Sequence, residues 1–211
     1  MSSQMHKAQR IGVFVDVQNL YYSAKNLYNS KVNFKEVLKD AVKGRTLIRA
    51  IAYVIRADIR EEKNFFDALK NIGFEVKAKD LQIFYGGAKK GDWDIGIAMD
   101  CIELAPRLDT IVIVSGDGDF VPLVQHLKRA LGCRVEVSAF GKSSSSKLVE
   151  ESDFFTDLDK SRKYLIELRR EEKKDGKEGA NEIRKEEKKE ERKEEKNKAD
   201  EIKAEKNQAS G

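Results

Sequence analysis

The stretch Ile-Gly-Val-Phe-Val at residues 11–15 ends in Asp16, and a second apolar stretch, Thr-Ile-Val-Ile-Val-Ser at residues 110–115, leads into Gly-Asp-Gly-Asp at residues 116–119. Both stretches are rich in β-branched residues and have the length of a fully buried strand. The carboxyl ends of parallel strands share one edge of an open sheet, where ligands bind near the point at which the strand order reverses. Acids far apart in the sequence are therefore expected to meet at this edge.

Apolar runs of strand length recur along the chain, and segments with helical periodicity separate them. The predicted strands are residues 11–16, 46–55, 74–84, 109–115 and 133–140, and residues 153–158 form either a last short strand or an extended cover. The predicted helices are residues 18–29, 33–43, 58–72, 92–105, 119–131 and 144–152. The alternation predicts an α/β fold with a Rossmann-like parallel sheet and helices on both faces.

The composition changes sharply towards the C-terminus. Residues 161–211 are mostly charged, with 17 basic and 15 acidic side chains out of totals of 41 and 37 in the whole chain. Tyr164, Leu165 and Leu168 are expected to pack one helical turn onto the core, and beyond them too little apolar surface remains to fold alone. We therefore expect one domain at residues 9–160 and a charged tail that is disordered or marginally helical.

The charge and the cysteines argue against several classes of protein. The net charge is only +4 and is shared by the domain and the tail, so no basic footprint for nucleic acid stands out, although a local basic groove stays open. Cys101 and Cys133 have no paired histidines, which argues for buried thiols and against a zinc site. No apolar run approaches the roughly 20 residues of a membrane span, so a cytoplasmic protein is expected.

Further acids lie between the two strands, in Lys-Gly-Asp-Trp-Asp at residues 90–94 and at Asp100. Taken alone, each Asp after a strand is more typical of a helix cap or a turn. Carboxylates a few ångströms apart, however, repel one another unless they are protonated or paired with a cation. Mg²⁺ or Mn²⁺ relieves the repulsion, using one or two carboxylates, waters and phosphate oxygens as ligands. The candidate metal ligands are Asp16, Asp94, Asp117 and Asp119.

Spacing separates the two acids of the predicted helix at residues 92–105. Asp94 and Asp100 are about 240° apart around the helix, so both cannot point into one site. Asp94, near the helix start, is the better ligand, and Asp100 is expected to support Lys90, a water or a loop. The glycines of Gly-Asp-Gly-Asp permit a tight turn close to a ligand. Ser115 can donate or accept a hydrogen bond near phosphate.

Other residues have an ordinary structural interpretation beside a functional one. Lys90 either neutralises phosphate or lies in an exposed loop. The serines at 143–146 are expected to cap the next helix, with phosphate binding by free N–H groups as the alternative. Four aromatic residues are more typical of packing than of base stacking, namely Tyr21, Tyr22, Phe84 and Tyr85.

Three short acidic motifs follow one another along the chain. They are Phe-Val-Asp-Val-Gln-Asn-Leu at 14–20, Lys-Gly-Asp-Trp-Asp-Ile-Gly-Ile-Ala-Met-Asp at 90–100, and Ser-Gly-Asp-Gly-Asp-Phe at 115–120. In these motifs the chain resembles the NYN domains, ribonuclease-like relatives of the PIN nucleases, and in particular their LabA-like branch. The resemblance covers roughly residues 9–160, and it implies a PIN-like α/β fold with an acidic, divalent-metal site that acts on RNA.

By motif position, the resemblance implies four metal-site acids, Asp16, Asp94, Asp117 and Asp119. It implies supporting positions for Asn19, Ser115, Lys90 and Asp100. The function expected is that of a ribonuclease that hydrolyses RNA phosphodiesters with Mg²⁺ or Mn²⁺, and the alternative is a non-catalytic RNA-binding or regulatory protein that keeps the acidic pocket. RNA is the expected partner and a membrane is not; homodimerisation and tail contacts with RNA or protein stay open.

Overall fold

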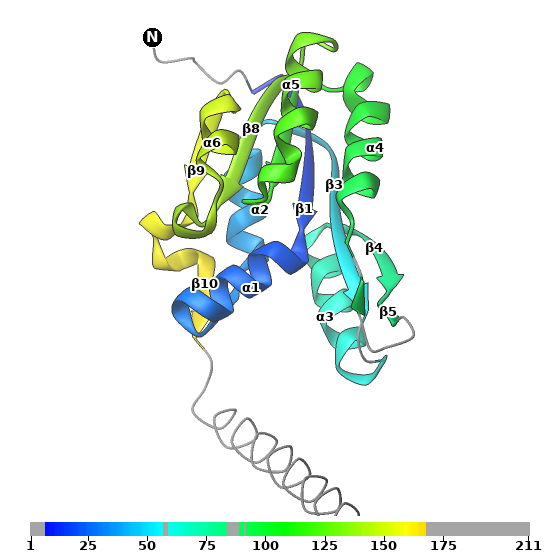
Figure 1. The fold of residues 1–211 in the computed structure, drawn as a ribbon, viewed down its shortest axis with the longest axis vertical. Helices are drawn as coiled ribbons and strands as arrows, with labels where there is room; N and C mark the ends of the chain where they lie inside the picture. The colour runs from blue at the N-terminus through cyan, green and yellow to red at the C-terminus, as the bar shows by residue number, and fades with distance from the viewer. Residues whose placement is uncertain (1–6, 57–58, 84–88, 91, 168–211) are drawn as a thin grey trace, which may run out of the picture. The chain divides into compact units, whose positions relative to one another are not determined.

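The computed structural model describes residues 7–56, 59–83, 89–90 and 92–167, and of residues 59–62, 82–83 and 89–90 it describes the backbone. Its main element is a six-stranded sheet in which all neighbouring strands run parallel (Figure 1). Across the sheet the strands are β4 (Glu75–Asp80), β3 (Thr46–Arg56), β1 (Arg10–Asp16), β7 (Thr110–Val114), β8 (Arg134–Ala139) and β9 (Phe154–Asp157). The predicted parallel sheet is confirmed, and residues 154–157 are its last strand.

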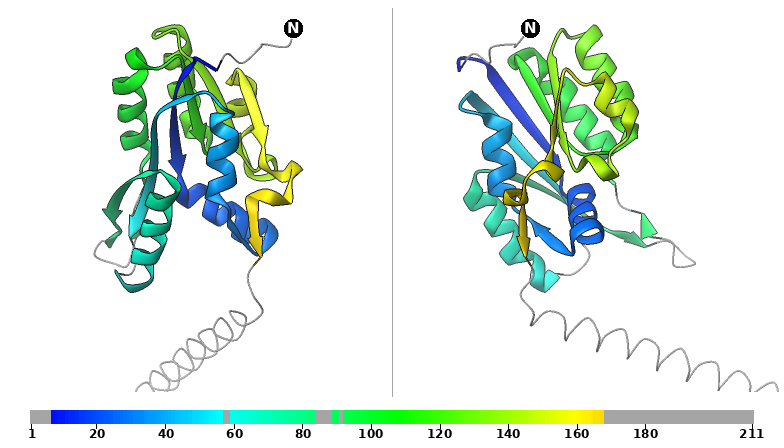
Figure 2. Two further views of the ribbon diagram at one scale, coloured as in Figure 1. Left: turned by 180° about the vertical axis from the view of Figure 1, so that it is seen from behind. Right: turned by 90° about the vertical axis from the view of Figure 1, so that its left-hand side faces the viewer.

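Helices cover both faces of this sheet (Figure 2). One face carries α1 (Val17–Tyr28), α2 (Phe34–Val42) and α3 (Ile59–Ile72), and the other carries α4 (Asp94–Leu104), α5 (Val121–Arg129) and α6 (Ser146–Glu151). Alternate residues of one strand supply the two cores, since Val13 and Val15 of β1 pack with α1 and α2, whereas Phe14 packs with α4 and α5. A strand buried on both faces requires this period of two.

The strand order reverses beside β1. The chain runs from β1 to β3 and β4 on one side and then returns to β7 on the other side, from which it continues to β8 and β9. This is a doubly wound order, whose switch point lies between β1 and β7. Because Val15 pairs with Val114, Asp16 and Ser115 leave the sheet side by side at one edge. That edge lies towards the bottom of Figure 1, where β1 passes into α1.

Short elements complete the fold. β2 (Ser30–Val32) pairs antiparallel with β10 (Leu165–Glu167), and β5 (Gln82–Ile83) pairs antiparallel with β6 (Lys89–Lys90). Short 3₁₀ helices are η1 (Ala105–Arg107), η2 (Gly118–Phe120), η3 (Gly141–Ser143), η4 (Leu158–Lys160) and η5 (Arg162–Tyr164). The strand predicted at 74–84 is confirmed as β4 over residues 75–80, but it does not continue as one strand. Its pairing with β3 ends at Arg56 and Asp80, and residues 82–83 pair with residues 89–90 instead.

The described fold continues past residue 160, where the sequence predicts the domain to end. Tyr164 is buried, as expected, and its hydroxyl donates a hydrogen bond to Asp40. Leu165 does not continue a helical turn, since β10 pairs with β2 and the Asn33 N–H donates to the Tyr164 carbonyl at 2.8 Å. Leu168 and the rest of the tail predicted at residues 161–211 lie outside the described residues.

A buried ion pair joins Arg45 and Glu136. Arg45, just before β3, donates two hydrogen bonds to the carboxylate of Glu136 in β8, at 3.0 and 2.9 Å, and a third to the Ala41 carbonyl at 2.7 Å. Burial alone raises the pKa of Glu136, but the hydrogen bonds from Arg45 and Arg134 outweigh burial and leave this pKa lowered. The pair therefore ties β8 to the chain between α2 and β3.

Both cysteines are buried and unpaired, as the sequence predicts. Within the described ranges, no helix has the length and apolar character needed to cross a membrane.

Candidate metal centre

Asp16 ends β1 and is the N-cap of α1. One oxygen of its carboxylate accepts a hydrogen bond from the Asn19 N–H at 3.0 Å, and the other accepts one from the Ser115 hydroxyl at 3.2 Å. Burial raises the pKa of Asp16, the hydrogen bonds from Asn19 and Ser115 oppose this, and the charge of Asp117 raises it further. The capping role is thus real, and the same carboxylate also faces the loop after β7.

The loop after β7 is tied to the end of β1 by hydrogen bonds. The Gly116 N–H donates to the side-chain oxygen of Asn19 at 3.0 Å. The Asp117 N–H donates to the Ser115 hydroxyl oxygen at 3.3 Å, and the Asp119 N–H donates to the Asp117 carboxylate at 3.0 Å. Asn19 and Ser115 therefore position the loop that carries Asp117 and Asp119.

Gly116 and Gly118 leave no room for a side chain. A Cβ atom on Gly116 would lie 2.8 Å from the Ser144 Oγ and 3.1 Å from the Ser144 Cα, and one on Gly118 would lie 2.9 Å from the Ser145 Oγ. Neither glycine is among the described glycines with a positive φ. Close packing against Ser144 and Ser145, rather than a left-handed backbone conformation, therefore favours glycine at these two positions. That the glycines bring the loop close to a ligand stays a prediction.

Asp94 is the first residue of α4, and Trp93 fixes the start of this helix. The Trp93 indole N–H donates to the Val54 carbonyl at 2.9 Å, and its ring leaves no space for a Cβ atom on Gly96, which would lie 2.5 Å from it. The Lys79 ammonium donates to the Asp92 carbonyl at 2.8 Å. These contacts attach the N-terminus of α4 to β3 and β4 and so aim Asp94 at the sheet edge.

Asp94, Asp117 and Asp119 form a compact group. One carboxylate oxygen of each lies within 4.8 Å of the others, and none of the ion pairs in the described part of the chain involves them. Burial, and then the negative charges of Asp117, Asp16, Asp92 and Asp119, raise the pKa of Asp94 from 3.8 to about 6. The group therefore has no ion-pair partner in this region.

Two hollows meet at these acids. One of about 380 Å³ is bordered by Asp16, Asp94 and Asp117 and extends along α1. The other, of about 340 Å³, lies between α4 and α5 and is bordered by Asp94 and Asp119. Three of the four predicted metal-site acids thus form one group, and Asp16 lies beside it across the first hollow. A hard divalent cation fits such an all-oxygen donor set.

The other predicted site residues do not all lie at the acid group. Asp100 lies outside the acid group, and its carboxylate accepts hydrogen bonds from the Tyr53 hydroxyl at 2.5 Å and from the Lys77 ammonium at 2.6 Å. The side chain of Lys90 lies outside the described residues, as do Phe84 and Tyr85. Asp100 therefore holds α4 to β3 and β4 rather than facing the hollow.

The NYN domain family model matches residues 10–159. The chain belongs to the NYN domain family. NYN domains are typically nucleases, generally bind RNA and usually use divalent metals.

The proteins similar to this NYN domain include two curated proteins and a solved structure. It is 25% identical to the low amplitude and bright protein LabA of Synechococcus elongatus over 181 residues, which are 79% of this chain and 92% of that protein. It is 29% identical over 150 residues to an uncharacterized protein of Methanocaldococcus jannaschii, with 69% of this chain and 53% of that protein covered. A crystal structure of a protein of unknown function from Vibrio parahaemolyticus matches with a TM-score of 0.71 at 32% identity, covering 77% of this chain and 99% of that one.

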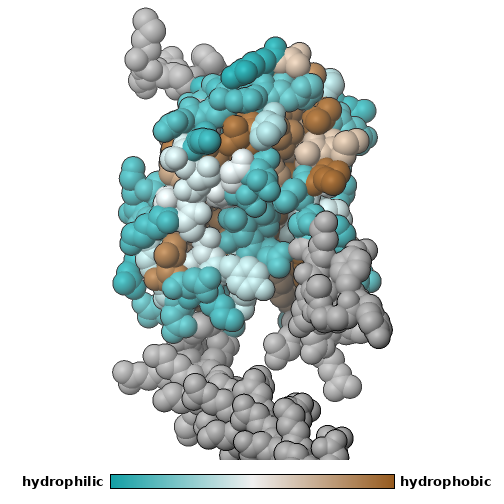
Figure 3. Space-filling view, viewed as in Figure 1, coloured by the Kyte–Doolittle hydropathy of each residue, from teal (hydrophilic) through white to brown (hydrophobic). Residues whose placement is uncertain are grey.

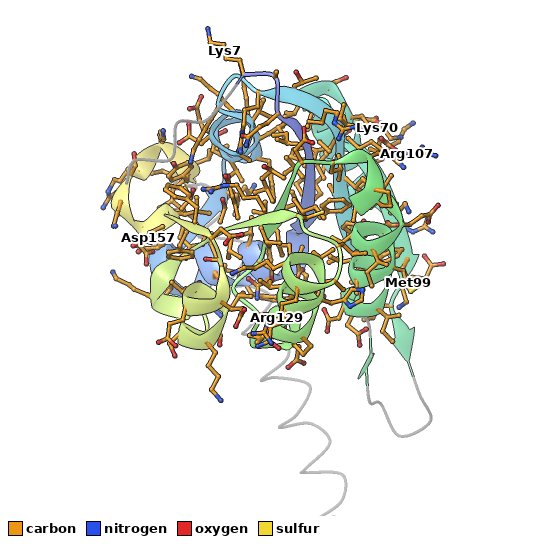
Figure 4. All side chains as sticks on the ribbon, turned by 90° about the horizontal axis from the view of Figure 1, so that it is seen from above. Lys7, Lys70, Met99, Arg107, Arg129 and Asp157 are labelled. Atoms are coloured by element: carbon orange, nitrogen blue, oxygen red, sulfur yellow. The ribbon has the colours of Figure 1, made fainter. Side chains whose placement is uncertain are left out.

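The two hollows of this NYN domain differ in character. Ile95, Met99 and Ile102 expose apolar side chains on α4 near the second hollow. Figure 4 labels Met99 on the outer side of α4, and Figure 3 shows hydrophobic surface on this side of the molecule. The first hollow instead has the amides of Gln18 and Asn26 in its lining. Gln18 and Asn26 are not among the site residues predicted from the sequence, although their spacing on the helix after Asp16 places them on the same side as Tyr22.

Proposed function

We propose that this NYN domain is a ribonuclease that hydrolyses RNA phosphodiesters and depends on Mg²⁺ or Mn²⁺. The observation that carries the proposal is the convergence of Asp94, Asp117 and Asp119 within 4.8 Å, with no basic partner among the described residues. Ionised carboxylates at this distance repel one another, and the raised pKa of Asp94 reflects that repulsion together with burial. A cation that neutralises the group would stabilise the ionised form that the site needs.

The four acids would hold the cation. Asp94, Asp117 and Asp119 supply the compact group, and Asp16 faces it with a carboxylate already oriented by the Asn19 N–H and the Ser115 hydroxyl. When bound, a divalent cation supplies Lewis acidity towards phosphoryl oxygens and charge for the transition state of phosphodiester hydrolysis. The acids would also orient a water for attack on phosphorus, because each keeps lone pairs free to accept a hydrogen bond.

Residues around the acids would act by positioning them. Asn19 and Ser115 fix the loop after β7, and Asp100 anchors α4 through Tyr53 and Lys77. A metal-dependent nuclease gains rate from such preorganisation, because groups that already point at the reacting phosphate need no reorganisation during the reaction. Lys90 remains a predicted partner for phosphate.

Cleavage of a diverse RNA pool tests this function. The purified protein should cut RNA with Mn²⁺ or Mg²⁺ and should not cut it in EDTA. Asp117→Asn should abolish cleavage while the folded protein keeps its circular dichroism spectrum, because the change removes a ligand charge without removing volume. Asp67→Asn, at an exposed position of α3, is the matched control and should cleave like the wild type.

Undiminished cleavage by Asp117→Asn would refute the assignment of the site. RNA binding without any product, in the presence of either metal, would instead favour a non-catalytic RNA-binding protein that keeps the acidic pocket.

A further inference from the structure

The first hollow continues from the acids along one stripe of α1. Gln18, Tyr22 and Asn26 line it and are spaced by four residues, which places them on one side of the helix. Asp16 and Asp94 border the same hollow at the sheet edge. A strand of RNA whose phosphate lies at the acids therefore has its neighbouring nucleotide within reach of this stripe.

The two amides of the stripe are available to a ligand. Within the described part of the chain, the side chains of Gln18 and Asn26 make no hydrogen bond, and Asn26 is exposed. Each amide offers both a donor and an acceptor. Amides of this kind pair with base edges, as Asn and Gln do with adenine, and an unpaired base exposes those edges.

Aromatic side chains line the same hollow as the amides. Tyr22 is 50% exposed, and its ring makes a T-shaped contact with the ring of Tyr21 at 5.4 Å between centroids. Trp93, whose indole N–H donates to the Val54 carbonyl, also lines the hollow. Exposed aromatic rings bind unpaired bases by stacking, whatever the base, so Tyr22 supplies affinity while the amides supply selectivity.

The charges of the hollow show which part of a nucleotide it suits. No Lys or Arg is among its described lining residues, and its charged groups are the carboxylates at the sheet edge. A second phosphate would be repelled there, whereas a neutral base and its ribose would not. The hollow thus fits the base next to the phosphate that is held at the acids.

We propose that this hollow is a nucleotide subsite, in which Tyr22 stacks on one unpaired base of the RNA and Gln18 and Asn26 select that base. The proposal rests on the proposed ribonuclease function for its RNA substrate, and it adds a determinant of where the RNA is cut.

Two measurements test the subsite, and only one of them requires cleavage. In the first, the cut sites of the wild type in a random single-stranded RNA pool are sequenced with Mn²⁺. One base should be enriched at a fixed position beside the cut, and Gln18→Ala combined with Asn26→Ala should lower that enrichment roughly 5-fold or more. Asn64→Ala, an exposed amide on α3, is the control and should keep the wild-type pattern.

In the second measurement, short single-stranded RNA homo-oligomers of each base are titrated against Asp117→Asn protein. Adding Tyr22→Ala should weaken binding of all four oligomers by roughly 5-fold or more, because stacking does not depend on the base. Adding Tyr21→Ala instead, at the neighbouring tyrosine outside the lining, should change binding less.

The results separate the two proposals. Cleavage and binding that ignore Gln18, Asn26 and Tyr22 would overturn the subsite and leave the ribonuclease in place. Tyr22-dependent binding without any cleavage would support the subsite and overturn the ribonuclease. Absence of both cleavage and binding would overturn both.

Discussion

Asn19 of α1 and Gly116 of the loop after β7 are joined by a hydrogen bond of 3.0 Å, from the Gly116 N–H to the Asn19 side-chain oxygen. The bond crosses the switch point of the sheet and links the segment after Asp16 to the loop that carries Asp117. Gly116 is buried, so its N–H would be left unsatisfied if the acceptor were removed. Asn19 is therefore a positioning residue for the acids.

Asn19→Ala should weaken both the fold and the site. An unsatisfied buried N–H costs about 1–3 kcal/mol, which should appear in the free energy of unfolding measured in urea. Misplacement of Asp117 should lower RNA cleavage by roughly tenfold or more. Asn64→Ala on α3 serves as the control, and wild-type stability and cleavage in Asn19→Ala would contradict this role.

Gly116→Ala should damage the site more than Gly118→Ala. The new Cβ at position 116 meets the Cα of Ser144, which is backbone, whereas the Cβ at position 118 meets only the side chain of Ser145. A side chain moves aside more easily than backbone does. The melting temperature and the Mn²⁺ affinity should both fall further in Gly116→Ala than in Gly118→Ala. Equal effects would argue against close packing as the reason for glycine.

Asp94→Asn should stabilise the metal-free protein above pH 6. The pKa of Asp94 is about 6 in the folded state, above its ordinary value of 3.8. A carboxyl group whose pKa is raised by folding contributes stability that is present below about 3.8 and is lost as the pH rises to about 6. Asn carries no charge at any pH, so the variant should lose this pH dependence together with its Mn²⁺ affinity. Urea unfolding in EDTA across this pH range measures the free energy of unfolding. An identical dependence of this free energy on pH in the variant and the wild type would contradict the raised pKa.

Glu136→Gln should destabilise the fold without changing the metal site. It leaves the buried Arg45 without its countercharge, for which a loss of about 3–5 kcal/mol is typical. Because the folded pKa of Glu136 is lowered, the stability it contributes is present above pH 4.5 and is lost as the pH falls through that lower pKa. Glu167→Gln breaks the exposed pair with Arg162 and should leave the melting temperature unchanged. A similar, small effect for both variants would refute a structural role for the buried pair.

The central strands could be predicted from the sequence because their pattern is strong. Residues 11–15 and 110–114 are almost continuously apolar, as strands buried on both faces must be. The pairs β2–β10 and β5–β6 could not be predicted, since strands of three and two residues carry no usable periodicity. Their partners lie in other parts of the chain, so tertiary contacts decide them.

The clustering of acids was likewise predictable in part. Asp16 and Asp117 follow neighbouring strands, so their approach follows from the strand order. The tighter grouping of Asp94 with Asp117 and Asp119 depends on how Trp93 attaches α4 to the sheet, which no local pattern encodes. The contacts of Gly116 with Ser143 and Ser144 also join segments distant in sequence, so no local pattern predicts them.

The most direct test of the metal centre is anomalous diffraction from crystals soaked in Mn²⁺ at a pH above 6, where Asp94 is ionised. An anomalous peak is expected among the carboxylates of Asp94, Asp117 and Asp119, and it should be lost in crystals of Asp117→Asn. The absence of a peak between these three carboxylates in the wild type, at saturating Mn²⁺, would contradict the proposed metal centre.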